Sequence, residues 1–220
     1  MSYDEADAWE EAAMDSIYEQ VTTDPAVKQQ FDEEFYDEIV KDFTENRLRS
    51  FYEEKPDIGA AAVAALNDGR MFLATHHTAA FMFAAVAAEV GLTATLFKPI
   101  VHGLVRSETA AGLITKLAIK HSDENLTKIL MDILSTHGGV DPRKVKQGGS
   151  AQTVWEELST VRRTRNRVFH QADTASLKEA QLAVNVVAAI LEEFFPAVVA
   201  KLGLHLHGSR VCAALNRPER

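Results

Sequence analysis

The chain has 220 residues, of which 46% are hydrophobic and 25% charged, with a formal net charge of −9. These values are ordinary for a globular protein of one domain, or of one domain with an extension, and the length is enough for a substantial core. The single cysteine, Cys212, excludes an internal disulfide and offers no metal-binding spacing, so we expect a reducing, cytoplasmic setting.

Residues 1–55 form an acidic segment with 17 acidic and 5 basic side chains, whereas the remainder has 15 acidic and 18 basic ones. This asymmetry indicates two functional parts. Apolar residues recur in residues 1–55 as in two amphipathic helices, broken near residues 22–25 and ended at Pro56. We expect an acidic helical extension packed on the domain. The alternative is an acidic arm that shields a basic cleft or docks on a partner.

The segment from residue 56 to residue 137 predicts a series of helices. The first, over residues 58–66, is expected to stop at residues 67–69, and a long apolar helix is expected over residues 70–90. Gly91 is expected to interrupt it, Pro99 to kink the next segment, and two more helices to cover residues 109–121 and 125–137. The Met and Phe residues at positions 71, 72, 81, 82 and 83 are assigned to the core.

The most hydrophobic window, residues 79–97, contains Glu89 and draws its apolar character largely from alanine. It therefore predicts a buried helix and no membrane span. The N-terminus also lacks the basic and apolar regions of a signal peptide.

The remainder of the chain contains a glycine-rich loop over residues 138–150 and a helix over residues 154–170. A connector and a closing helix over residues 176–202, bent at Pro196, come next. No window shows sustained β alternation, and the tail, residues 206–220, is expected to be partly mobile. The predicted fold is an all-α helical bundle over residues 56–205.

The helix predicted over residues 154–170 carries the clearest functional signal. Its apolar residues recur at helical spacing and define a buried stripe: Val154, Leu158, Val161, Val168 and Phe169. On a helical wheel Arg165 falls within that stripe, where an unpaired charge costs several kcal/mol. Asn166 and His170 are four residues apart and project from one side.

Residues 165–170 read R-N-x-x-x-H, and this pattern resembles the signature of the HEPN superfamily (higher eukaryotes and prokaryotes nucleotide-binding domain). The resemblance covers the motif and its all-helical surroundings, about residues 57–205. It implies a metal-independent endoribonuclease of a stress, defence or toxin type. It also implies a homodimer in which two copies of the motif helix face one cleft.

RNA cleavage through the 2′-OH requires a proton acceptor, a proton donor and positive charge against the phosphorane. A histidine, whose ordinary pKa is about 6.5, can serve as acid or base near neutrality, and a guanidinium offers paired donors to phosphoryl oxygens. Arg165, Asn166 and His170 are therefore the candidate catalytic residues. Arg165 and His170 are about 140° apart around an ideal helix. An arginine and a histidine can therefore meet in one site only if two copies of the helix contribute to it.

The three arginines Arg162, Arg163 and Arg167 are candidate substrate-binding residues, because a basic cluster suits RNA. They also fit a solvated helix face, and the net charge of −9 opposes nonspecific binding of polyanions. Glu89 is the candidate partner that orients Arg165, or that simply makes it structural. We predict no metal and no cofactor.

The alternative function is a non-catalytic HEPN-like module that binds nucleic acid, nucleotide or a protein partner. A regulatory protein is a further candidate partner. Toxin members of the resembled family usually have tyrosine two residues after the motif histidine. This chain has Ala172 there, so regulation through that tyrosine is not expected. His76 and His77 are adjacent and point apart on a helix, and His205 and His207 lack an acidic or thiolate companion for a metal.

Overall fold

The structure is a computed structural model that describes residues 41–105, 107–120 and 124–213. The chain divides into two compact units, Met1–Phe43 and Thr44–Arg220, and almost all of the described residues belong to the second. The two helices expected in residues 1–55, and the break near residues 22–25, fall mainly outside the described residues. Within the described part, the helix that precedes Pro56 ends at Glu54, as predicted.

The described residues are mostly helical, which confirms the all-α class, although they also include a two-stranded sheet. In chain order the elements are η1 (Asp42–Leu48), α3 (Arg49–Glu54), α4 (Ala60–Phe72), α5 (His77–Gly91), η2 (Leu92–Phe97), α6 (Lys98–Val105), α7 (Glu108–Lys120), α8 (Glu124–Gly138), α9 (Val154–Gln171), α10 (Leu177–Ala188), η3 (Ala189–Phe194), α11 (Phe195–Lys201), β1 (Leu204–His207) and β2 (Arg210–Ala213). The symbol η marks a π-helical stretch.

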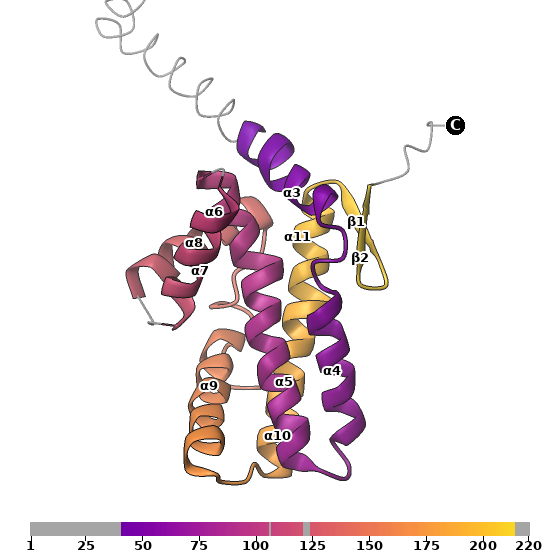
Figure 1. The fold of residues 1–220 in the computed structure, drawn as a ribbon, viewed down its shortest axis with the longest axis vertical. Coiled ribbons are helices and arrows are strands. Elements are labelled where there is room, and N and C mark those ends of the chain that lie inside the picture. The colour runs from indigo at the N-terminus through magenta and orange to yellow at the C-terminus, as the bar shows by residue number, and fades with distance from the viewer. Residues whose placement is uncertain (1–40, 106, 121–123, 214–220) are drawn as a thin grey trace, which may run out of the picture. The chain divides into compact units, whose positions relative to one another are not determined.

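Two long helical segments form the centre of the second unit. One joins α5, η2 and α6 over His77–Val105, and the other joins α10, η3 and α11 over Leu177–Lys201. They pack side by side, with α4 and α9 against α5 (Figure 1). Both are long and apolar enough to cross a membrane by length and composition, yet 61% of each apolar window is buried inside the protein. A mostly buried core helix passes the same test of length and composition. The sequence predicted a buried helix over residues 79–97.

Gly91 and the two prolines do not break these segments. The helix continues through Gly91, where an added Cβ would lie 2.9 Å from Leu191 Cδ2. This glycine therefore allows close packing between the two central segments, and the interruption predicted there is wrong. Pro99 and Pro196 each come after a π-helical stretch, η2 and η3. Proline lacks an N–H and crowds the preceding turn, so the wider stretch accommodates it within one helix.

The boundary between α4 and α5 also differs from the prediction. Helix α4 does not stop at residues 67–69 but continues to Phe72, and α5 begins only at His77. Gly69 is buried, and an added Cβ would lie 3.2 Å from Ala80 O and 3.3 Å from Ala84 N. Gly69 is thus a contact glycine between two helices, whereas the sequence suggested a helix end.

A β-hairpin over Leu204–Ala213 includes the described part of the tail, residues 206–220, which was predicted to be partly mobile. Leu204 pairs with Ala213 and His207 with Arg210 in an antiparallel ladder. Leu204 and Val211 are buried, and Gly208 in the turn has φ of 62°. Four-residue strands are too short to stand out as β alternation in the sequence. Residues 214–220 lie outside the described residues.

The remaining helices agree with the prediction. Helix α7 covers Glu108–Lys120, and Ser107 Oγ accepts a hydrogen bond from Ala110 N at 3.3 Å, which is an N-cap contact. Helix α8 covers Glu124–Gly138. The predicted loop comes next, and Asp141 accepts hydrogen bonds there from the Arg143 side chain. This loop connects α8 to α9.

Candidate functional site

Helix α9 covers Val154–Gln171 and confirms the predicted motif helix. Its start is a capping box. Glu156 N donates to Thr153 Oγ1 at 3.3 Å, and Thr153 N donates to Glu156 Oε2 at 2.7 Å. These bonds satisfy donors that a helix start otherwise leaves unpaired. At the other end Ala172 adopts a left-handed conformation with φ of 51°, and the chain turns there into α10.

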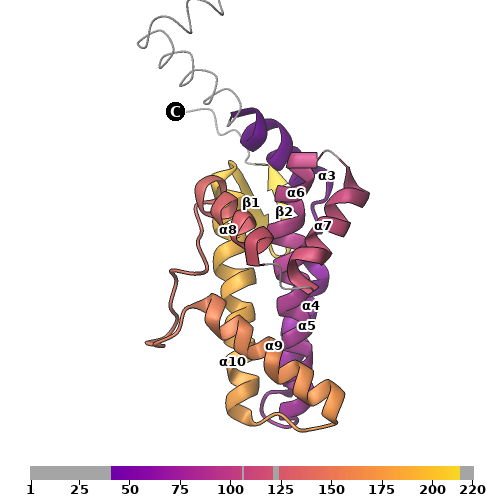
Figure 2. The same ribbon diagram turned by 90° about the vertical axis from the view of Figure 1, so that its left-hand side faces the viewer.

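The inner face of α9 packs on α5 and α10, while its outer face is open to solvent (Figure 2). The buried residues include the predicted stripe residues Val154, Leu158, Val161 and Val168. Phe169 was expected in the same stripe, but 68% of it is exposed. It lies in the last turn, where the helix extends past the residues that would cover it. The aromatic ring therefore faces solvent beside the motif histidine.

Arg165 lies at the edge of the stripe and not within it. Its Nη2 is 3.3 Å from Glu89 Oε2, and the two side chains are 39% and 43% exposed. The ion pair that the sequence suggested between α9 and α5 is thus present. Because both partners are substantially exposed, solvent screens the attraction, and such a pair contributes little to stability. Neither group is fixed as a buried structural ion would be.

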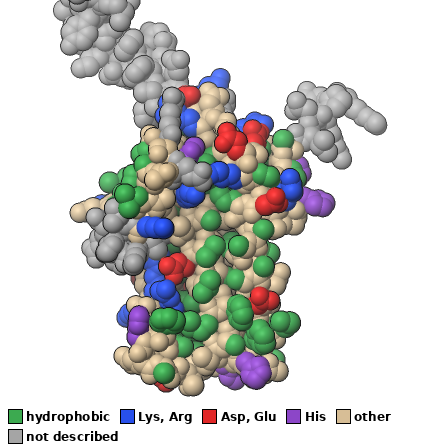
Figure 3. Space-filling view, in the orientation of Figure 1, with side chains coloured by type: hydrophobic (Ala, Val, Ile, Leu, Met, Phe, Trp, Pro, Cys, Tyr) green, Lys and Arg blue, Asp and Glu red, His purple; other side chains and the backbone are tan. Residues whose placement is uncertain are grey.

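Arg165 and Glu89 line a groove of about 660 Å³ that also involves α7. Lys116 adds a second positive charge from α7, and the remaining lining residues are Val86, Val90, Thr93 and Ala94. Basic side chains gather beside an acidic one over α9, next to hydrophobic side chains over α4 and α5 (Figure 3). The groove therefore combines two cations and one anion with an apolar wall.

Arg162 is the arginine that burial affects most, although the sequence placed it among the solvated ones. Its guanidinium lies 5.4 Å from the centre of the Trp155 ring, and its Nη2 is buried without a hydrogen-bond partner among the described residues. Burial lowers the pKa of Arg162, while the charge of Glu89 raises it and that of Arg165 lowers it. Arg162 thus lies close to the groove charges and has an unused donor.

The other two candidate substrate-binding residues differ from each other. Arg163 is exposed and donates to Thr160 Oγ1 at 3.1 Å, within α9. Arg167 is ion-paired with Asp173 and, at 2.6 Å, with Glu179. These hydrogen bonds raise the pKa of Arg167. The geometry makes Arg167 a link from α9 to the connector and α10, while Arg163 remains accessible to a ligand.

Asn166 and His170 are both exposed, one turn apart on α9. Neither side chain forms a hydrogen bond or ion pair with another residue in the part of the chain that the structure describes. The His170 ring meets the Phe169 ring edge-on, with centroids 5.2 Å apart. Neither residue lines the groove that contains Arg165. In one copy of the chain, therefore, Arg165 lines the groove and His170 lies outside it.

The site has features that the sequence did not reveal. Lys116 was not singled out, because a lone lysine in a predicted helix carries no signal until α7 is placed beside η2, where Lys116 lines the groove. Phe83 and Met71 were assigned to the core but are 37% and 66% exposed. Phe83, Val86 and Val90 follow helical spacing along α5 and form an exposed apolar stripe, of which Val86 and Val90 also line the groove.

The other histidines of the described chain do not form a metal site. His76 precedes α5 and His77 begins it, so the expectation that both lie within one helix is wrong. His205 and His207 are exposed and lie on one face of β1. Among the described residues no group of three or more His, Cys, Asp or Glu side chains is arranged to hold a metal ion.

Comparison of the chain with protein-family models, with curated proteins and with solved structures found no match.

Proposed function

We propose that this protein is a metal-independent endoribonuclease that cleaves single-stranded RNA through the 2′-OH and acts as a homodimer. The observation that carries the proposal is the exposed end of α9. Asn166 and His170 are open to solvent, with hydrogen-bonding groups that no other described residue uses, and Arg165 lines the adjoining groove. Such polar side chains at the end of a well-capped helix are available for a ligand.

Each residue has a role that its chemistry supports. His170 accepts the proton of the 2′-OH or donates a proton to the leaving 5′-oxygen, with solvent water in the other role, and Asn166 orients the histidine or donates to phosphate. Arg165 exchanges Glu89 for a phosphoryl oxygen and stabilises the charge of the phosphorane. Lys116 and Arg163 hold the neighbouring phosphates. The products are a 2′,3′-cyclic phosphate and a 5′-OH, and chelators leave the rate unchanged.

The homodimer is expected from the separation of Arg165 and His170 on one helix. A second copy can bring its His170 to the groove that holds Arg165. The exposed Phe169 and the stripe of Phe83, Val86 and Val90 lie near these residues and supply apolar area for self-association. The charged groove then lies between the two copies.

A non-catalytic binding module is the second candidate, and the Arg165–Glu89 ion pair favours it. If Arg165 stays paired with Glu89 when RNA is present, its guanidinium cannot stabilise the phosphorane. In that case the groove holds a nucleotide, a nucleic acid or a protein partner without cleaving it. Cleavage itself separates the two candidates.

The test uses a mixed single-stranded RNA in EDTA with wild type, His170→Ala and the control His207→Ala, which removes an exposed histidine on β1. We expect His170→Ala to lower the rate by about 100-fold or more and His207→Ala to leave it unchanged. Circular dichroism and oligomer size confirm matched folding. Equal rates for His170→Ala and wild type would exclude His170 from catalysis.

Mixing two inactive variants tests the composite site. Arg165→Ala and His170→Ala are each expected to be inactive alone, but after subunit exchange half of the dimers contain one intact Arg165–His170 pair. The mixture should recover roughly a quarter of wild-type activity if each site takes its arginine and histidine from different copies. No recovery after demonstrated exchange would place both residues of a site in one copy.

A further inference from the structure

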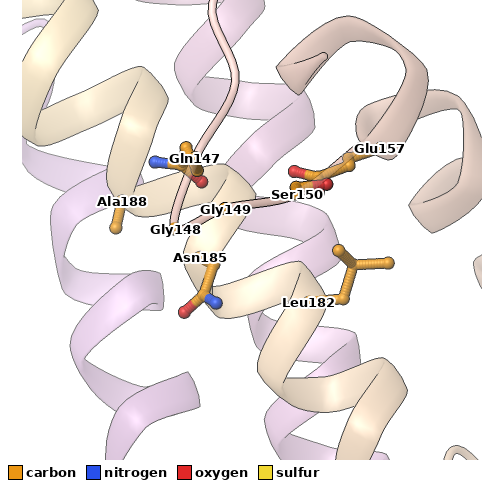
Figure 4. A pocket seen from close by; sticks show the side chains of 8 residues that line it. All are labelled: Gln147, Gly148, Gly149, Ser150, Glu157, Leu182, Asn185 and Ala188. Carbon is orange, nitrogen blue, oxygen red and sulfur yellow. The ribbon is translucent and has the colours of Figure 1, made fainter. Parts of the chain in front are cut away.

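A second pocket, of about 480 Å³, lies between α10 and the loop that leads into α9 (Figure 4). The loop supplies Gln147, Gly148, Gly149 and Ser150, the first turn of α9 supplies Glu157, and α10 supplies Leu182, Asn185 and Ala188. It lies at the opposite end of α9 from His170. Its lining shares no residue with the groove that contains Arg165.

The loop wall of this pocket is a formed turn. Ser150 N donates to Gln147 O at 2.7 Å, and the two central residues, Gly148 and Gly149, have φ of 50° and 78°. Positive φ at both central positions is the geometry of a type I′ turn, which glycine adopts without strain. An antiparallel bridge between Lys146 and Thr153 closes the base of the turn. The wall is therefore held in place without a ligand.

Glu157 is the anomaly in the pocket. It is only 5% exposed, and none of the described side chains forms an ion pair or hydrogen bond with it. Figure 4 shows its side chain directed from α9 toward Ser150 of the loop. A glutamate that is mostly covered usually has a cationic or hydrogen-bonding partner, whereas the carboxylate oxygens of Glu157 are not sealed from the pocket and can be reached by a ligand. Within the described chain, the position therefore lacks a cationic or hydrogen-bonding partner.

The amide side chains that line the pocket offer a ligand no free oxygen that it can reach. Gln147 Nε2 donates to Glu193 at 3.2 Å, whereas Gln147 Oε1 is buried with no partner among the described residues. Asn185 Oδ1 already accepts from Gln181 at 2.9 Å. Of the described residues that line the pocket, Glu157 alone is charged, and Leu182 and Ala188 add apolar surface. A ligand that matches the carboxylate and the apolar surface is positively charged and partly apolar.

We propose that this pocket binds a small organic cation, an ammonium or guanidinium group on a short alkyl chain. The cationic group pairs with Glu157, and the alkyl part lies against Leu182 and Ala188. A metal ion fits less well, because one carboxylate supplies too few ligands. The site is independent of the proposed ribonuclease activity, since it uses none of the same residues.

The test is isothermal titration of the full chain with agmatine, which has an ammonium and a guanidinium group on a four-carbon chain. Butyrate and n-butanol serve as anionic and neutral probes. We expect saturable binding of agmatine alone. Glu157→Gln should raise its Kd by about tenfold or more, since a charge-assisted pair is lost. Glu54→Gln, the same charge change at the exposed end of α3, should leave the Kd unchanged.

A second measurement locates the site if Glu157→Gln perturbs folding. Agmatine should shift the backbone amide resonances of Gly148 and Gly149, and Ala188→Leu, which fills the pocket from α10, should abolish those shifts. Saturable binding with these shifts supports the proposal. It is overturned if wild type does not bind agmatine, or if Glu157→Gln and Ala188→Leu bind it as wild type does.

Discussion

The two halves of α9 differ in burial: the first half packs against the core of the protein, whereas several side chains of the second half are exposed. The first half starts with a capping box, and Val154, Leu158 and Val161 in it are buried. In the last two turns Asn166, Phe169 and His170 are exposed to solvent, while Val168 between them is buried. One helix is thus fixed to the core at its start and leaves side chains accessible at its end.

This difference shows how a candidate site gains both rigidity and access. A side chain on a helix that is anchored by buried residues two turns earlier keeps its direction without contacts of its own. The exposed residues can then meet a ligand or a second copy. Arg162 and Arg165 mark the transition between the halves, the first mostly buried and the second ion-paired at the edge of the groove.

The largest contrast is expected between Leu158→Ala and Phe169→Ala. Leu158 is 2% exposed, and truncating such a leucine lowers the free energy of unfolding by about 2–5 kcal/mol. Phe169→Ala should change it by no more than about 0.5 kcal/mol at monomeric concentrations while weakening self-association. Urea denaturation and sedimentation measure the two effects. Similar losses of stability in both variants would mean that the ends of α9 are equally packed.

The capping box offers the next largest effect. Thr153→Ala removes the acceptor for Glu156 N and should lower the free energy of unfolding by about 1 kcal/mol. We expect hydrogen exchange to accelerate in the first turn of α9 and to stay unchanged in the last turn. Faster exchange throughout the helix would show that its two ends unfold together.

Arg162→Met tests the arginine between the two halves. Methionine keeps the contact with Trp155 and removes the buried unpaired Nη2, so the free energy of unfolding should stay level or rise. RNA affinity should fall if the unused donor binds phosphate. Thermal denaturation and a filter-binding assay separate the two results. A marked loss of stability would mean that Arg162 is a structural arginine.

The smallest effect concerns pH. The Thr153 backbone N–H, and then its hydroxyl, lower the pKa of Glu156 below its ordinary value of 4.5. A lowered pKa in the folded state gives stability that is present above pH 4.5 and is lost as the pH falls through the folded-state pKa. Glu156→Gln should therefore flatten the decline of the melting temperature between neutral and acidic pH. An unchanged decline would contradict the contribution of the cap.

Helix boundaries were predictable from the sequence where residues next to the boundary determine them. The boundaries of α9 and α10 are set by capping residues, Thr153 and Ser176, that precede apolar periodicity. Gly69 and Gly91 misled the prediction, because a glycine that ends a helix and one that admits a neighbouring helix look alike in sequence. The β-hairpin was missed because its buried residues, Leu204 and Val211, acquire partners only through tertiary packing.

The candidate site was predictable in part for the same reason. The pairing of Arg165 with Glu89 was expected from two charges in apolar helices, and it is present. Periodicity alone placed Phe169 inside and Arg162 outside, since a helical wheel does not show where the neighbouring helix ends. Lys116 and the pocket at Glu157 depend on which helices lie side by side, and no local pattern encodes that.

The most direct measurement compares cleavage by wild type, in EDTA, of one single-stranded RNA and of its 2′-O-methyl counterpart. We predict that only the unmodified RNA is cut, with 2′,3′-cyclic phosphate ends, and that His170→Ala cuts neither. Wild type that leaves the RNA intact, or that cuts both substrates, would contradict the assignment of the exposed end of α9 to 2′-OH chemistry.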